Sequence, residues 1–120
     1  MAFQKFTESG RGFKPQASIW TRGQISFNQG AAKRYNIDSY KYAVLYYDPE
    51  EKLVGIELTN DDQAEGIHKI RVRKSGTMVS AKAFLDYNDM DLSETRKYTL
   101  RKDDATGFLV IDLKEVASSK

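Results

Sequence analysis

The sequence WTRGQISF at residues 20–27 returns in altered form as RKSGTMVS at residues 73–80. The two stretches are offset by 53 residues, and the offset widens to 55 where VGIEL at residues 54–58 aligns with LVIDL at residues 109–113. Repeats in this length range are typical of repeated structural units. The chain is therefore predicted to contain one structural unit twice.

Each copy begins with the pattern of two short strands. Residues 17–22 and 69–73 alternate between apolar and polar side chains, which is typical of strands with one buried face. A glycine follows in both copies, where it tolerates the positive φ of a tight turn. The second strands are predicted at residues 25–27 and 78–80, at the same offset.

A short helix and a hairpin complete each copy. Asn28 and Ser80 are good N-cap residues and predict where the two helices begin. Apolar and aromatic runs around polar turns then predict hairpins at residues 42–58 and 96–113. We expect a mainly β fold with short helices, in which two β-β-α-β-β repeats form a single closed pseudo-two-fold barrel. Closure is favoured because it buries one core and removes most sheet edges.

The chain is short enough to form one domain. The two repeats and their linker make up a single barrel domain at residues 17–113. In chain order, the predicted parts are an N-terminal arm at residues 1–16, repeat one at residues 17–58, a polar linker at residues 59–66, repeat two at residues 67–113 and a tail at residues 114–120.

Composition excludes several classes of protein. The 120 residues include no cysteine, so neither disulfides nor thiolate metal sites are expected. The first residues lack the apolar region of a secretory signal, and no apolar run approaches the roughly 20 residues of a membrane helix. We therefore expect a cytoplasmic protein with no membrane partner. The formal net charge of +2 is too small to imply a polyanionic partner by itself.

The charges are nevertheless unevenly distributed. Four cations fall within six residues with no acid among them, namely Lys69, Arg71, Arg73 and Lys74. Alternation places Lys69, Arg71 and Arg73 on one strand face, about 6.6–6.8 Å apart, which is close to the phosphate repeat of a nucleic-acid strand. This stretch is the best candidate for a binding site. An edge strand protected from aggregation by its charge is the alternative interpretation.

Aromatic residues near the cations leave further interpretations open. Trp20 is predicted on the outward face, where it would stack on a base, anchor a partner protein or be covered by the N-terminal arm. A group of four tyrosines resembles a base-stacking stripe, but strand positions in a barrel explain it more simply: Tyr40, Tyr42, Tyr46 and Tyr47.

No motif of a catalytic, metal or cofactor site is present in the sequence. His68 is the only histidine, so the chain has neither a His-rich metal site nor a triad of histidine with cysteine. The acidic turns at residues 48–51 and 103–104 lack the spaced oxygen ligands and the glycine of an EF-hand loop. Phosphate loops, nucleophile elbows and dinucleotide fingerprints are missing as well. We expect a non-enzymatic protein without catalytic residues, cofactor or metal.

This order of elements resembles the AbrB/SpoVT/MazE-like swapped-hairpin family, in two tandem copies. The match is best for TRGQISFNQGAAKRYNI at residues 21–37 and fainter at residues 75–90. Family members usually build one barrel from two chains, and many bind DNA with it. The resemblance implies that this chain supplies both halves of a barrel, as a monomeric pseudo-dimer or as a homodimer.

The resemblance also implies a function and a site. Family contacts with DNA come from basic residues on the first strand, at the glycine turn and on the helix, while the arginine that often follows the turn glycine is Gln24 or Thr77 here. We expect a small DNA-binding protein similar to a transcription regulator, with double-stranded DNA as its partner. The alternatives are a protein-interaction or scaffold domain that binds another protein, and a single-stranded nucleic-acid binder. The candidate nucleic-acid-binding residues are Arg22, Lys33, Arg34, Arg71, Arg73 and Lys74, together with Lys69 of the basic strand.

Overall fold

The computed structural model describes residues 14–73 and 76–116. Each half of the chain contains two strands, a short helix and a hairpin, and the first half adds one 3₁₀ turn, η1. The elements are β1 (Gln16–Ile19), β2 (Gln24–Phe27), α1 (Gln29–Arg34), η1 (Ile37–Ser39), β3 (Tyr42–Asp48), β4 (Leu53–Thr59), β5 (Ile67–Arg73), β6 (Gly76–Ser80), α2 (Lys82–Tyr87), β7 (Arg96–Lys102) and β8 (Leu109–Val116).

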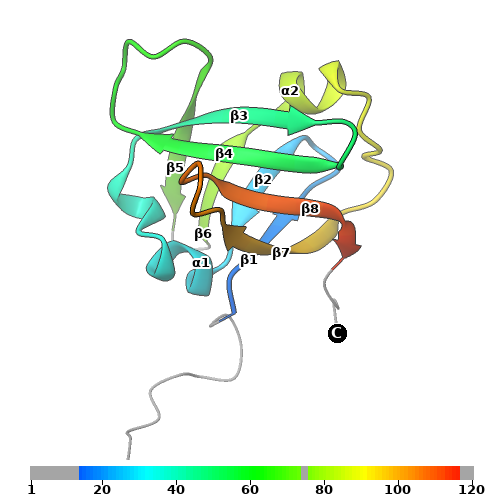
Figure 1. The fold of residues 1–120 in the computed structure, drawn as a ribbon, viewed down its shortest axis with the longest axis horizontal. Helices are drawn as coiled ribbons and strands as arrows, with labels where there is room; N and C mark the ends of the chain where they lie inside the picture. The colour runs from blue at the N-terminus through cyan, green and yellow to red at the C-terminus, as the bar shows by residue number, and fades with distance from the viewer. Residues whose placement is uncertain (1–13, 74–75, 117–120) are drawn as a thin grey trace, which may run out of the picture.

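The eight strands form one closed antiparallel barrel (Figure 1). Around the barrel their order is β1-β2-β6-β5-β3-β4-β8-β7, and β7 closes onto β1. The strands of the two halves interleave, because β2 pairs with β6 and β4 pairs with β8. Exchanging the two halves leaves this order unchanged. The predicted class, a mainly β closed barrel with short helices, is therefore confirmed.

Inward-facing apolar side chains from both halves fill the barrel. The predicted alternation holds at Ala17 of β1 and Ile70 of β5, which are buried. Val72 departs from it, because this residue near the end of β5 is 56% exposed. The largest fully buried side chains are Ile25, Ile37, Ile56, Leu85, Leu100, Leu109, Ile111, Val54 and Val79.

The second strands of the two halves align with an offset of 52 residues rather than 53. Ile19 of β1 lies opposite Ile25 of β2, whereas Val72 of β5 lies opposite Thr77 of β6. Val72 comes 53 residues after Ile19, but Thr77 comes only 52 residues after Ile25. The predicted alignment of Met78 with Ile25 is therefore wrong, because Thr77 is the buried residue. The connection between the two strands is in effect one residue shorter in the second half.

The two helices begin differently. Asn28 caps α1 as predicted, because its side-chain oxygen accepts hydrogen bonds from the N–H of Ala31 (2.8 Å) and from the first N–H of β1 (3.1 Å). The predicted cap of α2 is wrong, because Ser80 ends β6 and Ala81 takes the N-cap position without a side-chain hydrogen bond. The N–H of Ala81 donates instead to the carbonyl of Gly23 (2.8 Å). Among the described residues, no helix is long and apolar enough to cross a membrane.

Both predicted hairpins are present, as β3–β4 and β7–β8. Leu109, Val110 and Ile111 are buried in succession, so β8 is covered on both faces there. Beyond Leu113, β8 continues as far as Val116. These hairpins form the wall of the barrel that lies opposite β2 and β6.

Candidate nucleic-acid interface

The predicted basic strand is β5, and its outer face is cationic. Lys69, Arg71 and Arg73 are exposed, whereas Ile70 between them is 6% exposed and faces the core. Alternate residues of a strand lie about 6.8 Å apart on the same face. We call these three cations the basic strip.

On one side of the basic strip, β6 and the strands β2 and β1 beyond it carry no acidic residue, whereas on the other side β5 pairs with β3, which ends in Asp48. β1, β2, β6 and β5 are consecutive in the barrel, with the sequences QASI, QISF, GTMVS and IHKIRVR. Met78 of β6 lies directly opposite Arg71, and Ser26 of β2 lies opposite Met78. Of the remaining four strands, β3 and β4 each carry one acid, β7 carries four cations and β8 carries charges of both signs. The strands β1, β2, β6 and β5 therefore form a wall with cations and without an acidic residue, and β7 extends its positive charge beyond β1.

This wall has a further cation, Lys97, which was not among the predicted site residues. Lys97 of β7 lies opposite Ser18 of β1, which lies opposite Ser26 of β2. Ser26, Met78 and Arg71 continue the same row across β6 and β5. The row has a cation at each end, and four strand spacings, about 19 Å, separate them along the curved wall. Alternation along β7 indicates that Lys97 faces outwards, but only the β7–β1 pairing shows which surface it joins.

The remaining predicted cations are dispersed. Arg22 is exposed in the β1–β2 turn, which contacts the start of α2. Lys33 and Arg34 are exposed in the last turn of α1, which follows β2 at the other end of that strand. The structure therefore does not bring them into one cluster with Arg22. Lys74 lies outside the described residues.

Ion pairs do not neutralise the cations of this wall within the described part of the chain. The ion pairs found there involve α2, the segment before β7 and β8. They join Lys82 to Asp86, Arg96 to Asp91 and Glu94, and Lys114 to Asp112. The basic strip and Lys97 therefore keep their charge for a ligand.

Trp20 adds an exposed aromatic group directly after β1. The residue is 43% exposed, and its indole N–H donates to the hydroxyl of Ser26 at 2.7 Å. This hydrogen bond holds the indole against the outer wall, next to the row that ends in Arg71. The predicted outward position of Trp20 is therefore confirmed. The predicted arm that would cover it lies outside the described residues as far as residue 13.

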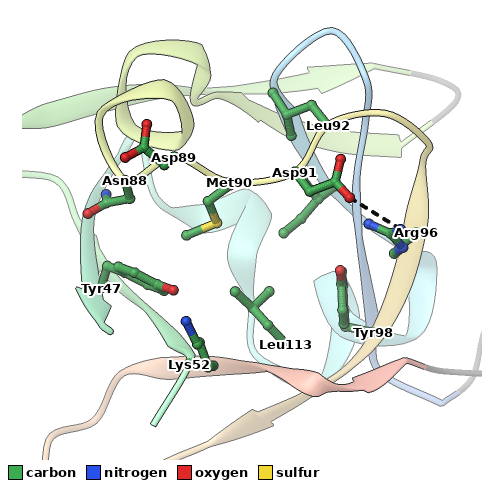
Figure 2. Close-up of a pocket in the computed structure, with 11 residues that line it drawn as sticks. Tyr47, Lys52, Asn88, Asp89, Met90, Asp91, Leu92, Arg96, Tyr98 and Leu113 are labelled. Atoms are coloured by element: carbon green, nitrogen blue, oxygen red, sulfur yellow. Dashed lines mark ion pairs between the residues drawn. The ribbon is translucent and has the colours of Figure 1, made fainter. Parts of the chain in front are cut away.

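The predicted tyrosine stripe is divided between different surfaces. Tyr46 faces outwards and stacks on Phe108, with ring centroids 4.6 Å apart. Gly55 leaves space for this stack, because a Cβ there would come within 3.2 Å of the Phe108 ring. The Tyr46 hydroxyl donates to Glu57 (2.8 Å), and this hydrogen bond raises the pKa of Tyr46. Tyr47, the next residue, lines a pocket at the end of the barrel instead (Figure 2). Strand positions therefore explain these tyrosines better than a base-stacking stripe does.

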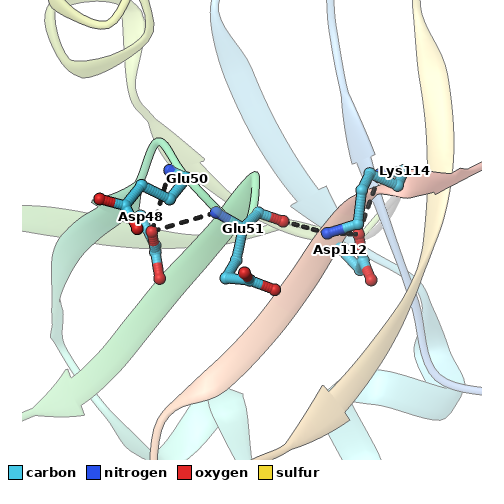
Figure 3. A network of polar contacts seen from close by, with 5 residues as sticks. All are labelled: Asp48, Glu50, Glu51, Asp112 and Lys114. Carbon is cyan, nitrogen blue, oxygen red and sulfur yellow. Dashed lines mark hydrogen bonds and ion pairs between the residues drawn. The ribbon is translucent and has the colours of Figure 1, made fainter.

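On the opposite wall, a network of polar contacts joins the β3–β4 turn to β8 (Figure 3). Asp48 accepts the N–H groups of Glu50 (3.1 Å) and Glu51 (3.2 Å). The ammonium group of Lys114 donates to the carbonyl of Glu51 and lies 3.4 Å from Asp112. The N–H of Lys114 also lowers the pKa of the Asp112 carboxyl. These contacts join the β3–β4 turn to β8, and Lys114 with Asp112 is the ion pair among them.

The described residues show no arrangement for a metal ion. Within residues 14–73 and 76–116, no three His, Asp or Glu side chains come together at a site that could hold one. His68, the only histidine, has its Nδ1 atom 3.2 Å from the carbonyl oxygen of Ser80. The imidazole therefore contributes to the contact between β5 and β6.

Comparison with models of known protein families, with curated proteins and with solved structures returned no match. The resemblance to the swapped-hairpin family therefore stays a prediction from the residues quoted for it. Any function must be argued from the surfaces of this chain, and the wall that carries the basic strip is the one with the clearest chemistry.

Proposed function

We propose that this protein binds double-stranded DNA through the outer wall formed by β1, β2, β6 and β5, in the manner of a transcription regulator. The observation that carries the proposal is the basic strip, Lys69, Arg71 and Arg73, on a wall of four strands without an acidic residue. Contacts of lysine and arginine with phosphates release counterions and supply most of the affinity in non-specific DNA binding. A wall with uncompensated cations offers this chemistry.

The row from Lys97 to Arg71 favours a duplex over an isolated phosphate. Its two cations lie about 19 Å apart along the wall, so the row is wider than the major groove of B-DNA, which measures about 12 Å. The two cations would therefore contact phosphates on the two sides of a groove. The uncharged side chains of Ser26 and Met78, between them in the row, would face the base edges.

A single-stranded nucleic acid is the second candidate ligand, and Trp20 is the observation that favours it. The indole is exposed on the same wall as the cations. Stacking of a base on an aromatic side chain contributes about 1–3 kcal/mol and tolerates any sequence. The hydrogen bond from the indole to Ser26 (2.7 Å) would hold the ring in place for stacking.

Fluorescence anisotropy of a labelled duplex, titrated with the protein at low and at moderate salt, tests the proposal. We expect binding at micromolar protein at low salt, weaker binding at moderate salt, and a loss of affinity when Arg71→Gln and Arg73→Gln are combined. A single strand of the same length and sequence is titrated in parallel. Preference for the single strand would replace the first candidate with the second. Absence of binding to either ligand at micromolar protein would reject both.

A further inference from the structure

A pocket of about 390 Å³ opens at the end of the barrel, beneath α2 and the segment that follows it (Figure 2). Side chains from β1, β3, β7, β8 and the β3–β4 turn also line it. The volume is at the lower end of the range of about 300–1,000 Å³ that is typical of small-molecule sites. Apolar side chains form part of its lining, namely Ile19, Met90, Leu92 and Leu113.

Hydrogen-bond donors without a protein acceptor face this pocket. Within the described part of the chain, Lys52, Tyr47 and Tyr98 line it and donate to no other residue. Tyr98 is the most informative, because it is 6% exposed while its hydroxyl remains reachable from the pocket. Burial raises the pKa of Tyr98 above its ordinary value, so the hydroxyl keeps its proton at neutral pH. The neighbouring Arg96 can only donate hydrogen bonds and cannot accept that proton.

Of the other charged residues at the pocket, Arg96 and Asp91 form an ion pair. Arg96 lies 3.7 Å from Asp91 and 3.4 Å from Glu94. Asp89 lies on the far side of the pocket from Lys52 in Figure 2. Lys52 has no ion pair within residues 14–73 and 76–116 and is exposed in its turn. Asp89 has no ion pair within the described residues either, so Lys52 is the unpaired cation of this pocket and Asp89, on its far side, the unpaired anion.

At the corresponding end of the barrel, beneath α1, the positions equivalent to Tyr98 and Lys52 carry no donor side chain. At the offset of 55 residues, Ala43 takes the place of Tyr98, and Gly107 takes the place of Lys52. The pocket at that end is smaller, about 230 Å³. That smaller pocket is lined by Tyr35, Tyr40 and Lys102, so the positions of Lys52 and Tyr98, rather than the presence of lysine and tyrosine, distinguish the pocket beneath α2.

We propose that the pocket beneath α2 binds a small organic acid. Its carboxylate would accept hydrogen bonds from Lys52 and Tyr47, and its apolar body would lie against Met90 and Leu113. A second acceptor on the ligand would reach the hydroxyl of Tyr98. Hydrogen bonds between ionised groups are roughly twice as strong as those between neutral groups, so the carboxylate at Lys52 is the main source of affinity. The inference is independent of DNA binding.

Hexanoate, adipate and the neutral analogue hexanamide are suitable probes, followed by the backbone amide signals of the ¹⁵N-labelled protein. We expect both acids to shift the amides of Met90 and Leu113 in saturable titrations, and hexanamide to bind more weakly. Lys52→Met should weaken the binding of both acids about tenfold or more, because it removes a hydrogen bond between charged groups. Lys102→Met, which removes an equally exposed ammonium group at the other end of the barrel, should leave the affinity unchanged.

Tyr98→Phe provides a second, independent variant that keeps the buried ring. It should weaken adipate more than hexanoate, because only adipate carries a second acceptor group. The dispersion of the amide spectrum shows whether each variant is folded. If Lys52→Met does not fold, the binding of the two acids to Tyr98→Phe tests the proposal. The proposal fails if neither acid shifts these amides at millimolar concentration, if hexanamide binds as tightly as hexanoate, or if Lys102→Met weakens binding as much as Lys52→Met.

Discussion

Replacing Arg71 and Arg73 by glutamine should halve the salt dependence of DNA binding. The proposed contact wall carries four cations, which are the basic strip and Lys97. Each phosphate contact contributes about −0.9 to the slope of log K against log salt, so the slope should be about −3.6 for the native protein and about −1.8 for the double variant. Between about 50 and 200 mM salt, these slopes correspond to losses in affinity of about 150-fold and about 12-fold.

The assay is fluorescence anisotropy of a labelled duplex at a series of potassium chloride concentrations. Arg101→Gln combined with Lys102→Gln is the matched control, because both residues are exposed on β7, away from the row that ends in Lys97. This control changes the net charge by the same amount as the test variant, and its slope should stay near that of the native protein. The reasoning is refuted if the control flattens the slope as much as the test variant, or if the test variant leaves the slope unchanged.

Three further predictions concern stability and ionisation. Gly23→Ala should lower the free energy of unfolding, measured in urea, more than Gly66→Ala does. Both glycines have positive φ (88° and 75°), but only at Gly23 would a Cβ come within 2.8 Å of the backbone of α2. Equal losses of stability in the two variants would contradict this reasoning. Asn28→Ala should cost about 1–2 kcal/mol in the same assay, because it removes the cap of α1 and its hydrogen bond to β1; an unchanged stability would count against it. Thr106→Ala should raise the pKa of Asp103, measured by NMR titration, because the hydrogen bond from the Thr106 hydroxyl is the main cause of its lowered value. The ionised Asp103 stabilises the folded state above the pKa of the unfolded chain, and this stabilisation is lost as the pH falls through the folded pKa. An unshifted titration would disprove the assignment.

Short-range patterns predict the strands and one helix cap, because these depend on residues close in the sequence. Alternation placed Ala17 and Ile70 in the core, and the cap at Asn28 follows from its own side chain. The cap predicted at Ser80 failed because Ser80 remains in β6, where it pairs with Gln24 of β2, and α2 therefore begins one residue later. This pairing joins residues far apart in the chain, and local sequence patterns do not reveal it.

The residues of the candidate sites also divide into those that a local pattern predicts and those that depend on strand pairing. The basic strip could be predicted because its three cations share one face of one strand. Lys97 could not, because it joins the wall only through the pairing of β7 with β1, whose residues are far apart in the chain. The pocket beneath α2 has the same origin, since Lys52 and Tyr98 come from different hairpins. No spacing in the sequence indicates that these two side chains line the same pocket.

The differences between the two halves have a physical consequence for any target. A barrel built from two identical chains repeats every substitution, and its contacts with DNA then mirror that symmetry in palindromic half-sites. In this chain a substitution changes one half alone. β5 carries the basic strip, whereas β1 has the sequence QASI and is followed by Trp20. The two halves of the proposed DNA contact would therefore differ in charge, so the preferred site should be asymmetric: the three cations of the basic strip concentrate phosphate contacts on the β5 side, whereas Lys97 is the single cation beside Trp20 and uncharged side chains on the β1 side.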